Sequence, residues 1–195
     1  MTKLEIFDPF FNYQVKWMFA GIEGTLEKDH AAYTCALALS TYTEIMGGLV
    51  TGNLKEERGH SKKNYEAFLP YLGEKYVDLN NQLKKQGSSL HEMVRNKLVH
   101  EFALRKSHVI WNSKGISDDK IGIEIIFVDN KIIHINFNLQ EYYRDFKNGV
   151  NKYYTKLKNW KKNQTTLGNF LKATVINFNH DKKLRLEDFK PDEEP

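Results

Sequence analysis

The chain of 195 residues contains one cysteine, so an intramolecular disulfide is impossible and a reducing compartment is expected. Cys35 stands among small and apolar residues, which predicts a buried thiol. The alternative, a nucleophile, would need a polar, electropositive setting. No window approaches the ~18 uninterrupted apolar residues of a membrane-spanning helix. The first residues lack the apolar core and cleavage site of a signal peptide. We therefore expect a cytoplasmic protein with no membrane partner.

Sequence signatures of cofactor and metal sites are missing as well. There is no Gly-x-Gly-x-x-Gly stretch and no phosphate-binding loop, which argues against the nucleotide cofactor sites that these motifs build. None of the seven histidines lies four residues from another, as in helical zinc sites, and no cluster of thiolates exists. We expect neither a cofactor nor a metal ion.

The composition is that of a soluble globular protein, with 28% charged and 41% hydrophobic residues. A net charge of +4 permits a polyanionic partner without requiring one. The length fits one domain better than two. We predict a single helical-bundle domain over residues 1–178, with a β insertion at about 107–137, and a charged tail over 179–195.

Apolar residues recur at spacings of three and four through most of the chain, as expected for helices with one buried face. Gly52-Asn53 and Asn138 are typical of a helix end and a helix start. The pattern predicts helices over about 9–24, 29–50, 64–72, 74–85, 89–106, 138–160 and 165–177.

Between two of these helices the pattern changes to strands. The runs 107–112, 122–128 and 131–136 are rich in Val, Ile, Phe and Trp, and Asp129-Asn130 is a tight-turn signal. The predicted fold class is mainly α, an antiparallel helical bundle with a small antiparallel β-hairpin or three-stranded meander inserted.

The predicted helix over 89–106 carries the strongest candidates for catalytic residues. Ser89 and Glu92 form a capping box at its start. Its buried face is expected to consist of the apolar residues at steps of four: Leu90, Val94, Leu98 and Phe102.

Three polar residues of this helix suit phosphodiester cleavage. Asn96 and His100 share a face, whereas Arg95 lies ~140° around the axis and ~7.5 Å along it from His100. A long arginine closes part of that gap, or a second chain supplies the facing helix. Histidine can exchange protons near neutral pH, and a guanidinium can hold a phosphate in a bidentate fork. The alternative is that all three are ordinary exposed helix residues.

The window from Leu90 to Phe102 resembles the core motif of the HEPN superfamily. In that family an arginine, often followed by asparagine, precedes a histidine on a late helix of an α-helical bundle. Arg95, Asn96 and His100 occupy those positions here, in the form Arg-Asn-x-x-x-His. The resemblance implies a homodimer with facing motif helices, in which Arg95, His100 and Asn96 form the catalytic site and Asn96 orients His100 or the phosphate.

The resemblance also implies an activity and its alternatives. Many members are metal-independent ribonucleases in toxin–antitoxin, phage-defence or RNA-processing systems, which implies an RNA substrate and, for a toxin, an antitoxin protein. Others have lost activity and only bind nucleotides or act as scaffolds. One branch carries a tyrosine two positions after the histidine, where this chain has Phe102, so that branch and its mode of neutralisation do not fit.

Further residues are candidates for lining this site or binding RNA. Tyr42 and Glu44 lie on the helix that packs near the motif helix in this architecture, although Tyr42 also fits the apolar stripe of a core. Lysines mixed with aromatics near the C-terminal end suit single-stranded RNA, or else form a solvated helix face. The remaining candidates are Glu92, Lys97, Lys152 and Lys156.

The leading hypothesis is therefore a HEPN-type endoribonuclease that cleaves single-stranded RNA by attack of the 2′-OH. Its products would be a 2′,3′-cyclic phosphate and a 5′-hydroxyl. The alternative is a non-catalytic dimerisation or nucleotide-binding module built on the same helix.

Overall fold

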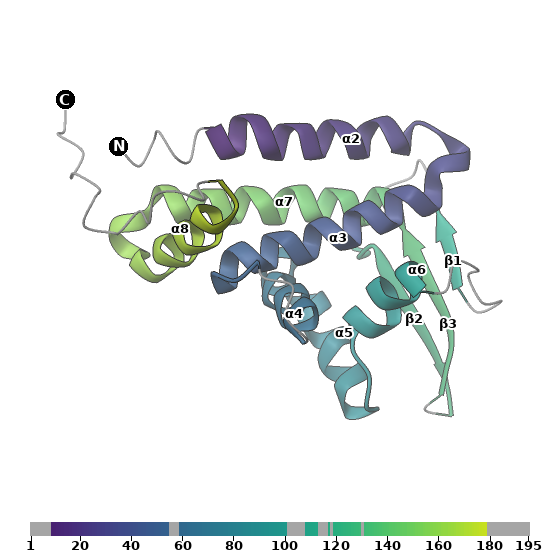
Figure 1. The fold of residues 1–195 in the computed structure, drawn as a ribbon. Coiled ribbons are helices and arrows are strands. Elements are labelled where there is room, and N and C mark those ends of the chain that lie inside the picture. Colours follow the sequence, from purple (N-terminus) through teal and green to yellow (C-terminus); the bar gives the residue numbers. More distant parts are fainter. Residues whose placement is uncertain are drawn as a thin grey trace.

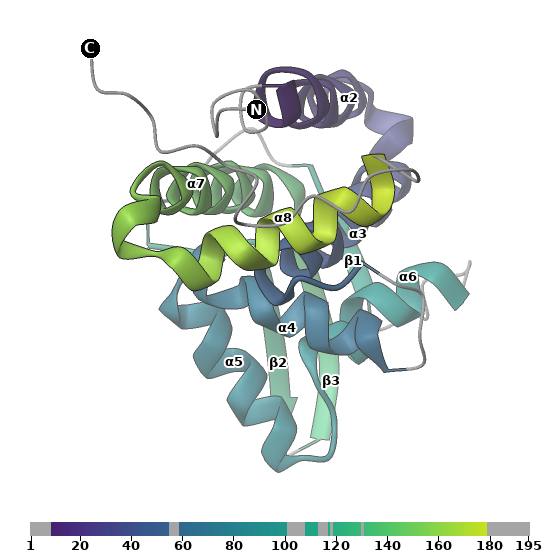
Figure 2. The ribbon, with the colours of Figure 1, turned by 60° about the vertical axis from the view of Figure 1, so that its left-hand side comes forward.

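The computed structural model describes residues 9–54, 59–100, 108–112, 117, 119–129 and 131–178. This part of the chain is mainly α-helical, with one small sheet (Figures 1 and 2). Its α-helices are α2 (Lys16–Leu26), α3 (Ala32–Thr51), α4 (His60–Leu72), α5 (Glu74–Lys85), α6 (Lys97–His100), α7 (Leu139–Lys158) and α8 (Gln164–Phe178). Its strands are β1 (His108–Trp111), β2 (Ile123–Val128) and β3 (Lys131–Asn138).

Helix α3 is the centre of the bundle. It packs against α2, α4, α7 and α8, while the sheet lies beside its first turns (Figure 1). Its buried face includes small residues, among them Cys35, Ala36 and Ser40, which allow neighbouring helices to approach. Gly52 ends the helix in the left-handed conformation, at φ 75°. The predicted helix over 29–50 and the buried Cys35 are thereby confirmed.

The closest approach in the bundle joins α3 to α4. A Cβ on Gly47 would lie 1.7 Å from the carbonyl oxygen of Asn64. The Asn64 side chain is buried there, donating to the Asn53 carbonyl and accepting from the Thr51 hydroxyl. Backbone contact without a side chain between the helices therefore fixes how α4 lies on α3.

Buried tyrosines join α7 to the rest of the core. The hydroxyls of Tyr65 and Tyr142 are 3.1 Å apart, and Tyr142 is also within hydrogen-bond distance of Thr43. Tyr76 donates to Asp145 and accepts from the Gly122 amide. Burial raises the pKa of Tyr142 to about 12, so this hydroxyl stays neutral and remains a donor.

The predicted β-hairpin is confirmed, but the sheet as a whole is mixed. β2 and β3 pair antiparallel around Asp129, whereas β1 pairs parallel with β3 on its other side, giving the order β1-β3-β2. A meander would have placed β2 in the middle. Trp111 pairs with Asn138 and Ile123 with Phe137, so β1 ends and β2 begins at the same end of the sheet. The connection between them is long enough to place the two strands on opposite edges of β3.

The predicted helix over 89–106 differs from the structure in its winding. Residues His91–Asn96 form a π-helical segment, which continues into α6. His91 is buried together with Leu90 and Val94. Leu90, Val94 and Leu98 are buried as predicted. Phe102 and the predicted end of the helix lie outside the described residues.

The remaining helices follow their sequence signals. Gly87 adopts φ 74° in the break before the motif helix, and the Asn138 side chain accepts from the amides of Gln140 and Glu141 to cap α7. The first predicted helix is confirmed as α2, preceded by a π-helical segment at Phe10–Val15. Within the described residues, no helix combines the length and apolar character needed to cross a membrane.

Replacing Gly47 tests the close approach of α3 and α4. Gly47→Ala should lower the free energy of unfolding by about 1–3 kcal/mol, because the added methyl overlaps backbone rather than a movable side chain. Gly24→Ala is the matched control, since nothing lies within 4 Å of a Cβ there, and it should stabilise by roughly 0.5–1 kcal/mol. Urea denaturation measures both, and equal effects of the two substitutions would contradict the packing.

Candidate active site

The guanidinium of Arg95 is held by a carboxylate from another helix. Arg95 Nε donates to Glu44 Oε2 over 2.7 Å, which ties the π-helical segment to the middle of α3. The two side chains are 23% and 19% exposed, so the pair lies at the edge of the core and within reach of solvent. The structure thus brings together two residues that the sequence proposed for one site.

The N-terminal end of α4 makes two more polar contacts with the same segment. Lys62 Nζ lies 3.0 Å from Glu92 Oε1, and this hydrogen bond lowers the pKa of the Glu92 carboxyl. Ser61 Oγ and His91 Nε2 share a hydrogen bond of 2.8 Å. The Ser89 hydroxyl also accepts from the Glu92 amide, as a capping box requires. Arg95 therefore projects from a segment that is held at several points.

His91 is the functional candidate that the sequence did not reveal. It is 4% exposed, its ring lies edge-on to Tyr65, and its Nδ1 has no partner among the described residues. Burial lowers the pKa of the imidazole below its usual range, and Arg95 and Lys62 lower it further, while Glu44 and Glu92 oppose the shift. On an ideal α-helix His91 lies ~100° around the axis from Leu90, between Leu98 and Phe102, so helical spacing indicated its burial. Nothing in the sequence indicated its contact with Ser61.

Two exposed aliphatic side chains flank the ion pair. Ile45 follows Glu44 on α3 and is 38% exposed, and Val99 lies one turn beyond Arg95 on α6 and is 37% exposed. Asn96 and Lys97 are half-buried beside them. His100 is the last residue of α6, and its side chain lies outside the described part of the chain. Its predicted relation to Arg95 therefore remains a prediction.

The other candidates lie elsewhere. Tyr42 packs against the hydrophobic core, in agreement with the apolar interpretation of that residue. Lys152 Nζ lies 3.4 Å from the Tyr71 carbonyl, and Lys156 Nζ lies 5.8 Å from the centre of the Tyr71 ring. Tyr71 is ten residues of helix, ~15 Å, from Ser61 at the other end of α4. These two lysines are not brought to the motif helix.

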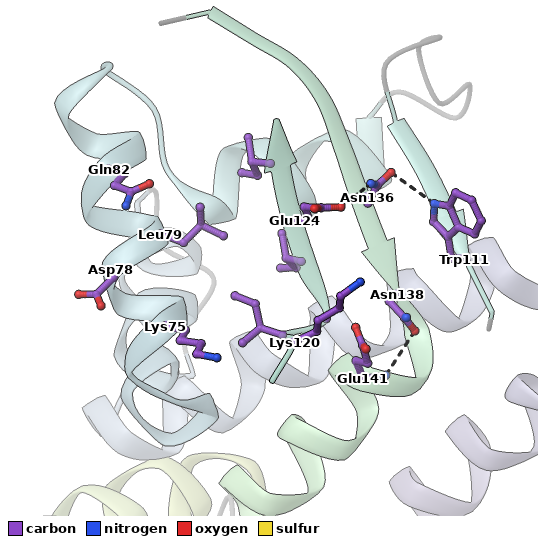
Figure 3. Close-up of a pocket in the computed structure, with 14 residues that line it drawn as sticks. Lys75, Asp78, Leu79, Gln82, Trp111, Lys120, Glu124, Asn136, Asn138 and Glu141 are labelled. Atoms are coloured by element: carbon purple, nitrogen blue, oxygen red, sulfur yellow. Dashed lines mark hydrogen bonds between the residues drawn. The ribbon is translucent and has the colours of Figure 1, made fainter. Parts of the chain in front are cut away.

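A separate cleft lies between α5 and the sheet (Figure 3). It has a volume of about 660 Å³, and its walls come from α5, the start of β2 and the ends of β1 and β3. The sequence predicted these elements, but it could not place α5 opposite the sheet. Among the described residues, no group of three histidine, cysteine or acidic side chains is arranged to hold a metal ion.

Comparisons with known proteins add no relative. The chain matches no family model, no curated protein and no solved structure. Function must therefore be argued from the chemistry of the Arg95 site and of the cleft between α5 and the sheet.

Substitution of His91 should change how stability depends on pH. Because the folded-state pKa of His91 is depressed, the unfolded chain, with a histidine pKa of about 6.5, binds the proton more readily. Stability should therefore be full above that value and fall as the pH drops from 7.5 to 5.5. In His91→Gln this fall should be smaller, as measured by urea midpoints at the two pH values. The exposed His30 provides the matched control, and a His30→Gln variant with the same reduced slope would contradict the assignment.

Proposed function

We propose that this protein is a metal-independent endoribonuclease of the HEPN type that cleaves single-stranded RNA as a homodimer. The observation that carries the proposal is the Arg95–Glu44 pair. It presents the arginine of the Arg-Asn-x-x-x-His motif at a partly exposed edge of the core, on a segment secured by α3 and α4. A preorganised guanidinium of this kind suits the charge that develops on a phosphate during cleavage.

The proposed reaction is an internal transesterification followed by release of the two fragments. His100 accepts the proton of the ribose 2′-OH, and the 2′-oxygen forms a bond to phosphorus while the bond to the 5′-oxygen breaks. A histidinium donates a proton to the leaving 5′-oxygen. Arg95 stabilises the charge on the non-bridging oxygens, and Asn96 orients His100 or the phosphate. The products are a 2′,3′-cyclic phosphate and a 5′-hydroxyl.

The second subunit is part of the proposal for two reasons. On an ideal α-helix, positions five apart, such as 95 and 100, lie ~140° apart around the axis, so a facing copy completes the set most simply. The exposed Ile45 and Val99 beside the ion pair supply apolar surface that a second motif helix would cover. Two histidines across a two-fold axis would provide acid and base together.

The same ion pair also favours a second candidate function. Glu44 neutralises Arg95 in the free protein, and a phosphate must compete with this carboxylate. If a phosphate can displace Glu44 and bind Arg95 but is not cleaved, the protein is a non-catalytic dimerisation or nucleotide-binding module. The two candidates differ in turnover.

The decisive measurement is cleavage of single-stranded RNA by the purified full chain in EDTA. Wild type should generate ends with a cyclic phosphate, and His100→Ala and Arg95→Ala should each lower the rate about 10²- to 10⁴-fold. His30→Ala is the control, because His30 is exposed and lies between α2 and α3, and it should retain the wild-type rate. Binding without cleavage by wild type would support the non-catalytic module. Equal cleavage by all variants would reject both.

Removing the charge of Glu44 should strengthen RNA binding but slow turnover. Glu44→Gln keeps a hydrogen-bonding side chain but removes the competing charge, so KM for RNA should fall. Because Arg95 is then held less firmly, kcat should fall as well. Steady-state kinetics of the variant separate these two constants. An unchanged KM would show that Glu44 does not compete with the phosphate, and Glu27→Gln serves as the exposed control.

A further inference from the structure

The cleft between α5 and the sheet combines an aromatic wall with a polar floor and two cations. Lys75, Leu79 and Gln82 line it from α5, and residues 120–125 line it from the opposite side. Trp111 stands at the far end on β1 and is 52% exposed. An exposed tryptophan in a cleft of this size offers a surface on which a flat ring can stack.

A row of hydrogen bonds runs from that indole across all three strands (Figure 3). Trp111 Nε1 donates to Asn136 Oδ1 over 3.3 Å, and Asn136 Nδ2 donates to Glu124 Oε2 over 2.7 Å. Neighbouring strands lie ~4.8 Å apart, so the row extends over roughly 10 Å of the sheet. The indole, the amide and the carboxylate are thus held in fixed relation on one floor.

The row keeps hydrogen-bonding capacity for a ligand. A carboxylate has about four acceptor positions, and Glu124 uses one of them on Asn136. The Asn136 amide has two N–H groups and gives one of them to Glu124. The floor therefore offers two acceptor oxygens next to one donor.

This pattern matches the Watson–Crick edge of guanine. Guanine presents O6 as an acceptor beside N1–H and N2–H₂ as donors, so its two donors face Glu124 and its O6 faces Asn136. Adenine, cytosine and uracil each place at least one acceptor where the carboxylate requires a donor. A carboxylate facing a lone pair is repulsive, which gives the floor a preference among bases.

The charges of the cleft suit the rest of a nucleotide. Figure 3 shows Lys75 and Lys120 directed into the cleft, whereas Asp78 points away from the sheet. Glu141 is buried, and its carboxylate accepts from the Ser117 amide. Lys75 Nζ donates to the Asp119 carbonyl over 2.6 Å and keeps two further N–H donors, so Lys75 and Lys120 can both contact a phosphate.

We propose that this cleft binds a guanine nucleotide, with the base stacked on Trp111 and read by Glu124 and Asn136. The choice of RNA as its natural source rests on the proposed function, in which the cleft would select where the chain cleaves. Free guanosine monophosphate presents the same chemistry, and the experiment separates the two sources.

Binding is measured by fluorescence anisotropy with labelled hexauridine that carries one guanosine or one adenosine. The full-length Arg95→Ala protein in EDTA keeps the RNA intact. We expect the guanosine oligomer to bind about tenfold more tightly than the adenosine oligomer. Trp111→Ala should weaken both by about tenfold, through loss of stacking, and Glu124→Gln should abolish the preference while leaving residual binding.

Controls address folding and position. Trp17→Ala and Glu27→Gln remove an exposed tryptophan and an exposed glutamate outside the cleft, and both should leave binding unchanged. Trp111→Phe keeps an aromatic ring and should retain most of the affinity, which covers the case in which the alanine variant fails to fold. Equal binding of the two oligomers, or a preference unaffected by Glu124→Gln, would overturn the proposal.

Two further arms distinguish the ligand sources and the two proposals. If unlabelled guanosine monophosphate displaces the oligomer at a concentration equal to the oligomer's own Kd, the cleft serves free nucleotides. Displacement only at much higher concentration assigns it to RNA. Guanine-selective binding by a wild-type protein that never cleaves RNA supports the cleft and rejects the ribonuclease, whereas cleavage without selectivity does the reverse.

Discussion

The contact between Gly47 of α3 and the Asn64 carbonyl of α4 is the constraint on which the rest of the arrangement depends. Because no side chain separates these backbones, α4 has one available position on α3. That position places Ser61 and Lys62 against the motif helix. Glu44 lies one turn before Gly47 on α3, where it meets Arg95. One missing Cβ thus sets the relative position of three helices that contribute to the candidate active site.

Polar groups in this protein fall into two classes with different consequences. The buried hydroxyls of Tyr65 and Tyr142 are hydrogen-bonded to each other, and that of Tyr76 donates to Asp145 and accepts from the Gly122 amide. These contacts specify how α7 and the sheet fit the core. The ion pairs of Arg95 and Lys62 lie nearer solvent, where such pairs contribute about 0–1 kcal/mol to stability. Their contribution is therefore mainly to position the motif segment, which is what a catalytic guanidinium requires.

The β insertion gives the helical bundle a second candidate site, the cleft between α5 and the sheet. The parallel pairing of β1 with β3 brings Trp111 to the same floor as Asn136 and Glu124. A simple hairpin would contain the latter two residues without the indole. The α5 wall completes the cleft, and the same helix leads through the Gly87 turn into the motif segment. This helix lines the proposed base-binding cleft, and the segment of the proposed site of cleavage follows it in the chain.

The sequence by itself determined the helices, the hairpin and the buried faces, because periodicity, caps and turn residues act over a few neighbours. Asn138 as a cap, the Asp129 turn and the Leu90–Val94–Leu98 stripe are examples. It also singled out Arg95 and Glu44 through the HEPN resemblance. Only the tertiary structure decided that these two meet, that His91 is hydrogen-bonded to Ser61, that β1 lies parallel to β3, and that α5 faces Trp111 and Glu124 across a cleft. Each of these depends on contacts between distant segments, whose geometry follows from the packing of backbones and not from any local pattern.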